Sequence, residues 1–593
     1  MPRSVLAALA MLAVSVAAQT PFLSLKDVRP GMRGTGRTVF SGTRIDEFQV
    51  EILGVLENVG PKESLILARL SGGPLEQTGV MEGMSGSPVY IDGKLVGAVA
   101  MAFPFSKQPI AAIRPIEDMV RISTPSAGLA RRGGHLDGQR AAIQLADADL
   151  TLAIPGPQPM LAGGVGLADI ATPISFGGFS QATLDVFGPR LRKLGLEPRQ
   201  GAGGGSSQPV MGNPAELKPG SMISVQLLAG DFTVDAQGTV TYIDGNRLYA
   251  FGHRFLSVGA TALPFARAEV VTLIPSVNTS FKLSAAREWM GSIQQDRSTA
   301  IAGELGKRPP MAPVNLTVSR GGRTVDSYHI QMVEDPLLSP LLLQMALYSA
   351  VDFTERSVGA ESLRITGKID FQNAPGPLWI ANVFAADNGA AQQASLSTAI
   401  PLAYLMQSGF AGLRLKSVDL EIEVSDRKRE LSIDSVTAAR RQVRAGEKVT
   451  LHVLLAGDGG VESERTVEYA VPIGATPGPL YFTVSDALTA NLSDFRQVLT
   501  ATPRTETQML AAVNNLHPNN KAYVRVWRTD SAFQVEGADL GAVPASVALV
   551  LDAAQSNQSG ITQSRNSKIA EIEIDGGEMV ISGAKTVQVE VKE

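Results

Sequence analysis

The chain of 593 residues contains no cysteine, and this absence excludes disulfide bonds, thiolate catalysis and cysteine-ligated metal sites. Its five histidines are far apart in the sequence, and no His-x-x-x-His or Glu-x-x-His grouping indicates a metal centre. Phosphate-binding loops and dinucleotide fingerprints are missing as well. We therefore expect neither a metal nor another cofactor.

The chain also lacks an excess of positive charge. The chain has 52 lysines and arginines against 57 aspartates and glutamates, which gives a formal net charge of −5. Binding to a phosphate backbone needs a basic face. The composition therefore argues against a nucleic-acid partner.

Long hydrophobic runs are absent after the first residues. Arg3, the apolar stretch 5–16 and the small residues Ala17 and Ala18 predict an export signal over 1–18, with a mature start at Gln19. A short membrane anchor is the alternative, but the run is shorter than the ~20 residues that a span needs. We expect an exported protein, periplasmic or extracellular, with no membrane span after signal removal.

Glycine (59) and proline (35) are plentiful, and hydrophobic residues make up 44%, which favours several mainly β domains. Alternating strands at 37–40, 48–56 and 64–70 suggest a small barrel or half-barrel. The predicted organisation is a signal peptide at 1–18, a first β-rich unit at 19–125, a linker and helical insert at 126–215, a second β-rich unit at 216–335, a helical or mixed connecting region at 336–418 and a β-sandwich-like region at 419–593.

Helical patterns interrupt the strands at four places. They predict helices over 181–194, about 338–352, 395–409 and about 492–515, and Pro401 is expected to kink the third. The short apolar run 547–551 is predicted to be a strand.

One motif carries nucleophile chemistry. Residues 83–88 read Gly-Met-Ser-Gly-Ser-Pro, and the pair Asp92 and Gly93 then joins two apolar strands as in a type I′ hairpin. Glycines around Ser85 allow a sharp turn that brings backbone N–H groups near a serine oxygen. We prefer Ser85 to Ser87 as nucleophile, because Ser87 lies against a proline and starts the strand.

Among the histidines, His253 differs from the rest. It follows Gly252 directly after a strand, where one ring nitrogen can face a serine and the other a carboxylate. The alternative, a histidine in a glycine-flanked turn without a catalytic role, stays open. The other four lie in a glycine-rich linker, inside strand patterns or before a proline: His135, His329, His452 and His517.

The segment 83–99 resembles the nucleophile turn of trypsin-like serine peptidases and, more closely, the SpoIVB peptidase family. The segment 238–253 is similar to the histidine segment of the same family. This resemblance implies a permuted, trypsin-like double β-barrel, with the serine-bearing half at 19–125 and the histidine-bearing half at 216–335. It implies Ser85 as nucleophile and His253 as general base. The glycine turn itself indicates the backbone N–H groups of Gly83 and Ser85 as the donors of an oxyanion hole.

The sequence departs from that family in two respects that concern the site. Here the serine segment precedes the histidine segment, and no aspartate lies shortly before the nucleophile turn. Permuted order suggests Asp296 as the third triad member, although an ion pair with Arg297 is its plainer interpretation. Asp244 and Glu76 are alternatives, and a serine–histidine dyad without an acid is another.

The resulting hypothesis is an exported serine endopeptidase that acts on protein or peptide substrates. The alternative is a catalytically inactive, peptidase-like protein that binds partners or serves as a scaffold in the cell envelope.

Overall fold

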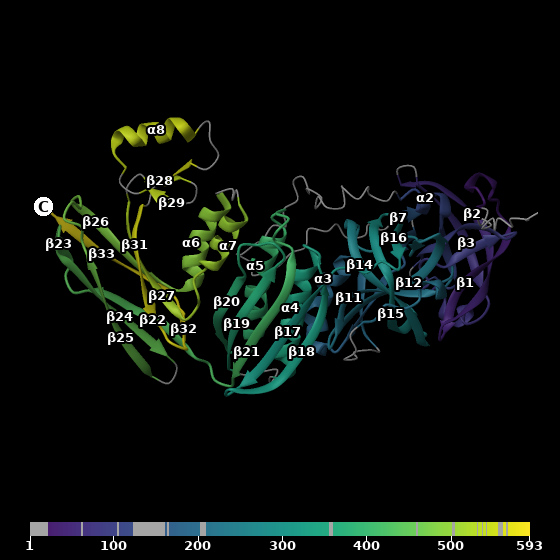
Figure 1. Cartoon of the computed structure of the whole chain (residues 1–593), viewed down its shortest axis with the longest axis horizontal. Coiled ribbons are helices and arrows are strands. Elements are labelled where there is room, and N and C mark those ends of the chain that lie inside the picture. Colours follow the sequence, from purple (N-terminus) through teal and green to yellow (C-terminus); the bar gives the residue numbers. More distant parts are fainter. Residues whose placement is uncertain are drawn as a thin grey trace, which may run out of the picture.

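The chain advances along one long axis, from the earliest strands at one end to the C-terminus at the other (Figure 1). The computed structural model describes residues 22–593 except 61–62, 104–105, 123–159, 163–164, 202–208, 355–359, 458–459, 501–504, 530–531, 536–537, 541–542, 556–560 and 565–566. The expected signal peptide and the first part of the insert lie outside the described residues. None of the described helices combines the length and the apolar character that a membrane crossing requires.

The first strands close into a six-stranded antiparallel barrel, which we call barrel one. Apolar residues alternate along these strands, as Phe48, Val50 and Ile52 do in β2, so one face of each strand packs against the core. The hydrogen-bonded order is β1-β2-β3-β6-β5-β4, and β4 pairs back onto β1. The strands are β1 (Arg33–Ser41), β2 (Arg44–Gly60), β3 (Glu63–Ser71), β4 (Pro88–Ile91), β5 (Lys94–Ala102) and β6 (Ile110–Pro115).

The predicted hairpin of barrel one is confirmed. Asp92 and Gly93 join β4 to β5 with φ values of 49° and 76°, the positive values that a type I′ turn requires. Three short helices flank the strands of the first half and the approach to the second: η1 (Leu25–Asp27), α1 (Leu75–Thr78) and η3 (Pro214–Glu216).

A second six-stranded antiparallel barrel, barrel two, has the same strand order as barrel one. Its order is β11-β12-β13-β16-β15-β14, closed by the pairing of β14 with β11. The strands are β11 (Met222–Gly230), β12 (Thr233–Asp244), β13 (Arg247–Ala250), β14 (Gly259–Ile274), β15 (Phe281–Arg297) and β16 (Ala300–Leu305). The fold is mainly β with two closed barrels, as the resemblance implied.

The insert between the barrels contributes strands to both of them. In its described part β7 and β8 extend the sheet of barrel one, whereas β9 and β10 extend that of barrel two. The predicted helix matches α3, whose N-cap Ser180 accepts a hydrogen bond from the Thr183 N–H. The elements are α2 (Ile116–Val120), β7 (Met160–Ala162), β8 (Val165–Asp169), β9 (Thr172–Gly177), α3 (Gln181–Lys193) and β10 (Leu196–Gln200).

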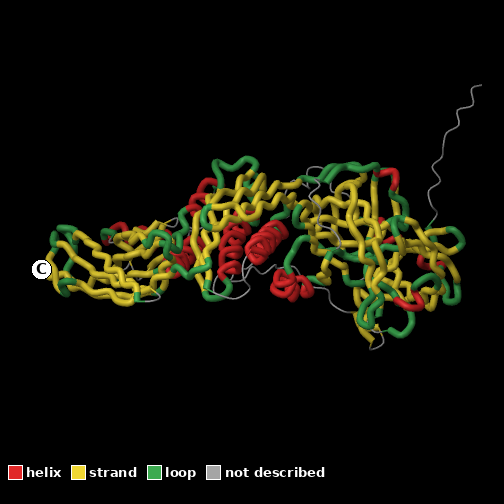
Figure 2. Tube along the Cα trace, turned by 90° about the horizontal axis from the view of Figure 1, so that it is seen from below, coloured by secondary structure: helices red, strands yellow, loops and turns green. Residues whose placement is uncertain are grey.

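The sheet of barrel two continues into the middle of the molecule, where the longest helices gather (Figure 2). Both apolar helices expected here are present, and Pro401 lies inside the second. Strand β21 spans the expected boundary at 418/419. The elements are β17 (Met311–Arg320), β18 (Arg323–Val333), α4 (Leu338–Thr354), β19 (Glu361–Phe371), β20 (Leu378–Ala386), α5 (Ala390–Met406) and β21 (Leu415–Ser425).

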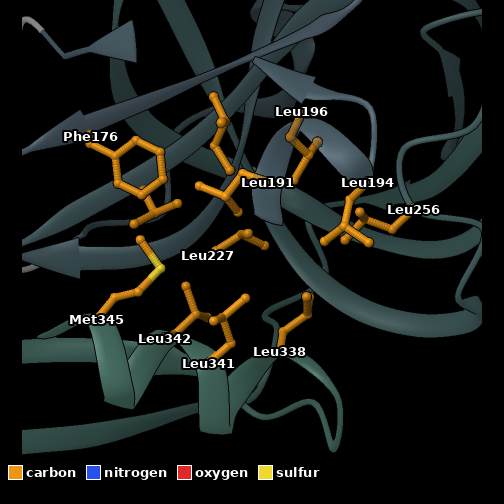
Figure 3. A pocket seen from close by; sticks show the side chains of 12 residues that line it. Phe176, Leu191, Leu194, Leu196, Leu227, Leu256, Leu338, Leu341, Leu342 and Met345 are labelled. Carbon is orange, nitrogen blue, oxygen red and sulfur yellow. The ribbon is translucent and has the colours of Figure 1, made fainter. Parts of the chain in front are cut away.

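Helix α4 packs onto α3 and barrel two through leucine side chains (Figure 3). The cavity left among them holds only about 20 Å³, and every residue around it is apolar. A space of this size has room for little more than a water molecule and offers no polar partner. It is a packing defect of the core and carries no chemistry.

The C-terminal part is a sandwich of a four-stranded and a five-stranded sheet that share one apolar core. The run 547–551, expected as a strand, is helical in α8. Pro544 precedes that helix, and alanines of high helix propensity flank the β-branched residues. The elements are β22 (Glu430–Ala438), β23 (Gln442–Arg444), β24 (Lys448–Gly457), β25 (Val461–Ala470), β26 (Gly478–Ser485), α6 (Ala487–Thr500), α7 (Glu506–Asn514), β27 (Lys521–Arg528), β28 (Ala532–Val535), β29 (Ala538–Leu540), α8 (Ala545–Gln555), β30 (Ile561–Ser564), β31 (Ser567–Asp575), β32 (Val580–Ser582) and β33 (Ala584–Lys592).

Candidate active site

Ser85 lies in the turn between the third and fourth strands of barrel one. The turn is possible because Gly83 and Gly86 take φ values of 90° and 92°, which most side chains avoid. The Ser87 hydroxyl donates to the Met84 carbonyl at 2.6 Å and so closes the turn internally. Ser87 is thus occupied structurally, whereas Ser85 is not.

Strand β12 of barrel two holds this turn from the other side. The Thr239 N–H donates to the Ser85 carbonyl at 2.8 Å, and the Thr239 hydroxyl donates to the Gly83 carbonyl at 2.9 Å. The Thr241 hydroxyl donates to the Gly86 carbonyl at 2.7 Å. All of these groups are buried, so the turn that carries Ser85 is held by the neighbouring barrel.

His253 lies in the equivalent connection of barrel two, between its third and fourth strands. The backbone turns there through positive φ values at Phe251 (70°) and Gly252 (72°). Such a φ at a bulky residue is rare, costs about 1–3 kcal/mol, and clusters at functional sites. The Phe251 N–H donates to the Thr239 carbonyl at 3.3 Å, so one residue of β12 binds both turns.

The two turns touch each other without intervening side chains. A Cβ atom on Gly86 would lie 2.0 Å from the Thr239 oxygen and 2.6 Å from the Phe251 nitrogen. A Cβ on Gly252 would lie 3.1 Å from the Ala98 Cβ of barrel one. Only glycine permits this approach, which brings the segments that carry Ser85 and His253 together at the junction of the barrels.

The hydrogen bonds of His253 define its tautomer. Its Nδ1 lies 2.6 Å from the Arg254 carbonyl oxygen, which can only accept, so Nδ1 carries the proton and Nε2 of the neutral ring keeps a lone pair. Burial lowers the pKa of His253 below its ordinary value of 6.5, and the Asp169 carboxylate is the strongest influence that raises it. The ring is therefore neutral at pH 7 and able to take a proton.

Ser85 Oγ and His253 Nε2 are both buried and without a hydrogen-bond partner among the described residues. They are not hydrogen-bonded to each other in this state. Within the same described part, no hydrogen bond uses the backbone N–H of Gly83 or Ser85. These are the two donors expected from the sequence to form an oxyanion hole.

Asp296 lies beneath the loop that follows His253. Its carboxylate accepts backbone hydrogen bonds from Phe255 (2.8 Å), Leu256 (2.7 Å) and Val258 (3.2 Å). Burial raises the pKa of Asp296, and these N–H groups oppose the shift. Asp296 thus supports the loop that follows His253. It does not accept the Nδ1 proton of the ring as a third triad member would, because Nδ1 is bonded to the Arg254 carbonyl.

The two alternative acids lie elsewhere. Asp244 is exposed at the end of β12, before the turn to β13, and Glu76 is exposed in α1.

Asp169, at the end of β8, is a residue that sequence reasoning missed. It lines a cavity of about 140 Å³ together with His253. The rest of the lining comes from the adjoining chain and from the start of the histidine loop: Ala168, Ile170, Ala171, Thr172, Leu194, Gly195, Arg254 and Phe255. No spacing rule links an aspartate in the insert to His253, and the sequence offers no signal that could have found it.

Lys282, on β15, is a second unforeseen neighbour. Its side chain would lie 3.3 Å from a Cβ on Gly83, and its Nζ donates to the Thr38 hydroxyl at 2.6 Å. Burial lowers the pKa of Lys282 to about 7. Since its nitrogen is engaged by Thr38, we assign it a packing role under the turn.

One group of possible metal ligands lies together among the described residues, in the C-terminal sandwich: Asp494, His517 and Glu571. The Arg525 guanidinium donates to Asp494 and to Glu571, both at 2.6 Å. It already supplies the positive charge between these carboxylates, so the group is a half-buried ion-pair network.

Comparisons with known proteins agree with the first barrel. Residues 14–109 match the family model described as SpoIVB peptidase S55. The matched range includes Ser85 and most of barrel one, whereas His253 lies outside it. No curated protein and no solved structure gave a match. Over residues 14–109, the chain is therefore similar to the SpoIVB peptidase S55 family.

Proposed function

We propose that the protein is a serine endopeptidase that cleaves peptide bonds by acyl transfer through Ser85. The observation that carries this proposal is the pair of buried, unpartnered atoms, Ser85 Oγ and His253 Nε2, on two turns in contact. Buried polar atoms are nearly always hydrogen-bonded, and a catalytic role is one of the recognised explanations for an exception. The similarity of residues 14–109 to the SpoIVB peptidase S55 family supports a peptidase.

In the proposed reaction, His253 Nε2 takes the proton of Ser85 Oγ while Oγ attacks the carbonyl carbon of the substrate. The N–H groups of Gly83 and Ser85 stabilise the oxyanion, and one such donor is worth about 10²–10³ in rate. The imidazolium returns its proton to the leaving amine as the C–N bond breaks. Water then hydrolyses the acyl-enzyme with His253 again as base.

Two further groups position the imidazole ring of His253 in this mechanism. The Arg254 carbonyl fixes the Nδ1–H tautomer, and Asp296 fixes the loop that follows. Asp296 is then the supporting acid of the site, and in the substrate-free state the negative charge of Asp169 favours the imidazolium. We further propose that the protein is exported, on the basis of residues 1–18.

The test compares Ser85→Ala with Ser87→Ala in the mature chain, using a fluorescently labelled unfolded protein as substrate. Loss of the nucleophile is expected to lower cleavage by at least about 10³-fold. Ser87→Ala removes a hydroxyl of the same turn that bonds to the Met84 carbonyl, and it is expected to stay within about tenfold of the wild type because one buried hydrogen bond is worth only about 1 kcal/mol.

Equal cleavage by Ser85→Ala and wild type would refute the mechanism. Absence of cleavage by every variant, with an intact fold, would favour the alternative of an inactive, peptidase-like binding protein. The complete burial of Ser85 in this state is the observation on the side of that alternative.

A further inference from the structure

One edge of β5 carries three neighbours in succession. Its first residues pair with β4, up to Ala98. Val99 then exchanges two backbone hydrogen bonds with the nucleophile turn, to Gly86 (2.8 Å) and Ser87 (3.0 Å). Because β6 pairs along the opposite edge, whatever follows Val99 on this edge continues from the turn that carries Ser85.

The chain itself fills the next positions of that edge. Strand β8 pairs antiparallel with β5, Ala168 opposite Ala102 and Asp169 opposite Met101, and the Ile170 N–H donates to the Ala100 carbonyl at 3.1 Å. Residues 168–170 thus begin one position beyond the contact between β5 and the nucleophile turn.

The direction of this segment matters. In antiparallel pairing, residue numbers rise along β8 as they fall along β5, so the segment runs with its carboxyl side towards Ser85. The next residues, Ala171 and Thr172, line the cavity with His253, and the chain then enters β9 of the other sheet. The segment therefore lies as an extended peptide would lie on its way into the site.

We propose that residues 168–170 occupy in cis the edge of β5 to which a peptide substrate binds, so that a substrate has to displace them. This inference rests on the proposed function and extends it to regulation and substrate class. The ligand is an extended polypeptide segment that adds as a strand to Ala100–Ala102. Ile170 is buried in the apolar cluster of barrel one, so the ligand carries an aliphatic side chain at the equivalent position.

Displacement requires little rearrangement. Two residue pairs and one further backbone hydrogen bond join the segment to β5, and β7 is its only other strand partner in the described part of the chain. Strand β9 keeps its own pairing with β10 and β12 whether or not the segment leaves. Exchange with a peptide of the same backbone geometry is therefore feasible without unfolding either barrel.

A disulfide lock tests this directly, because the chain has no cysteine of its own. In Ala102→Cys/Ala168→Cys the new residues are register partners across the pair, a position from which a disulfide can form. The oxidised protein is expected to cleave unfolded protein at least tenfold more slowly than the same protein after reduction. Equal rates in the two forms would overturn the proposal.

The matched control is Thr35→Cys/Gln49→Cys. Its residues are register partners as well, but its disulfide joins β1 to β2, away from the edge that the proposal concerns. Oxidation is expected to leave its cleavage rate unchanged. A similar loss in this control would mean that cross-linking barrel one is enough to cause the effect, and it would also overturn the proposal.

A binding measurement separates this inference from the proposed function. In the Ser85→Ala background, which cannot cleave, fluorescence anisotropy measures binding of a labelled peptide with the sequence of residues 165–172. Reduced Ala102→Cys/Ala168→Cys is expected to bind it saturably, and the oxidised form at least tenfold more weakly. If the peptide binds in this way but the wild type has no peptidase activity, the proposed function is refuted and this inference stands. If the wild type is active but the oxidised and reduced forms bind the peptide equally, the inference is refuted and the proposed function stands.

A second variant acts in the other direction. Ile170→Ala keeps the backbone hydrogen bond but removes the buried side chain that holds the segment, so the same labelled peptide is expected to bind at least threefold more tightly than to Ser85→Ala alone. Unchanged or weaker binding would contradict the proposal.

Discussion

At the scale of single residues, the site depends on how His253 is kept neutral and oriented. Burial lowers its pKa, and the Arg254 carbonyl holds the proton on Nδ1. Both effects leave Nε2 as an acceptor towards the neighbouring turn. Protonation of the ring at low pH removes the base, so activity is expected to fall as the pH falls through the pKa of His253, below 6.5.

The first prediction concerns Asp169→Asn. The Asp169 carboxylate favours the imidazolium and raises the pKa of His253, so its removal is expected to lower that pKa further. The acidic limb of the pH profile for fluorophosphonate labelling should therefore move to lower pH. Asp244→Asn, which changes an exposed turn residue, should leave the limb in place, and a shift to higher pH in Asp169→Asn would contradict the account.

Sequence reasoning reached part of the site at this scale. Ser85 followed from a six-residue motif, and His253 followed from elimination among five histidines and a strand–glycine context. Asp169 could not be predicted, since only the pairing of β8 with β5 brings it near the ring. The support that Asp296 gives to backbone N–H groups was equally invisible, because no sequence pattern encodes it.

At the scale of elements, glycine governs how closely the nucleophile turn approaches β12. Gly86 has a positive φ and no room for a Cβ atom, since the Thr239 oxygen would be 2.0 Å away. Gly93, in the turn between β4 and β5, also has a positive φ but has open space around it. An alanine at Gly93 would therefore meet only the strain of a positive φ, whereas an alanine at Gly86 would meet that strain and a steric clash.

The second prediction uses this pair. Gly86→Ala should push the turn away from barrel two and destabilise the protein by several kcal/mol, with loss of cleavage. Gly93→Ala should cost only about 1–2 kcal/mol, the strain of a left-handed residue, and keep its activity. Thermal unfolding and cleavage assays measure both effects, and an active Gly86→Ala variant of normal stability would be incompatible with the described contact.

Elements were predictable where periodicity was long and regular. The helices over 338–352 and 395–409 appear as α4 and α5 because apolar runs of that length suit helices. The prediction of a strand over 547–551 was wrong, because a run of five apolar residues fits a strand or a helix equally well. The residues around this run, and not its own pattern, make it part of α8.

At the scale of the whole molecule, two barrels of identical strand order face each other and each contributes one turn to the site. Their sequences showed no detectable repeat, since a barrel core requires only alternating apolar residues of suitable volume. The resemblance to a double-barrel family, rather than composition, made this architecture predictable. The continuation of the second sheet through β21 was not foreseen.

The C-terminal sandwich is attached to the middle of the molecule partly through α7. Leu510 of that helix is buried in the large core that also contains α4 and α5, and the Glu506 carboxylate accepts a hydrogen bond from the Gly412 N–H at 2.9 Å. The sandwich thus depends on this helix for its position, whereas Ser85 and His253 lie in other elements.

The third prediction is that Leu510→Asp loosens this attachment. A charge in place of a buried leucine costs several kcal/mol locally, so small-angle X-ray scattering should show a larger radius of gyration while peptidase activity persists. Ala511→Asp places the same charge on the exposed face of α7 and should leave the scattering unchanged. Loss of activity in Leu510→Asp with unchanged scattering would argue against independent roles for the two parts.

The central claim is that Ser85 and His253 work as nucleophile and base at the junction of the barrels. Mass-spectrometric mapping of the fluorophosphonate adduct, with labelling rates for the wild type and His253→Gln, tests it most directly. The account predicts an adduct on Ser85 and a rate at least about 10²-fold lower in His253→Gln. An adduct on another residue, or equal rates in the two proteins, would contradict it.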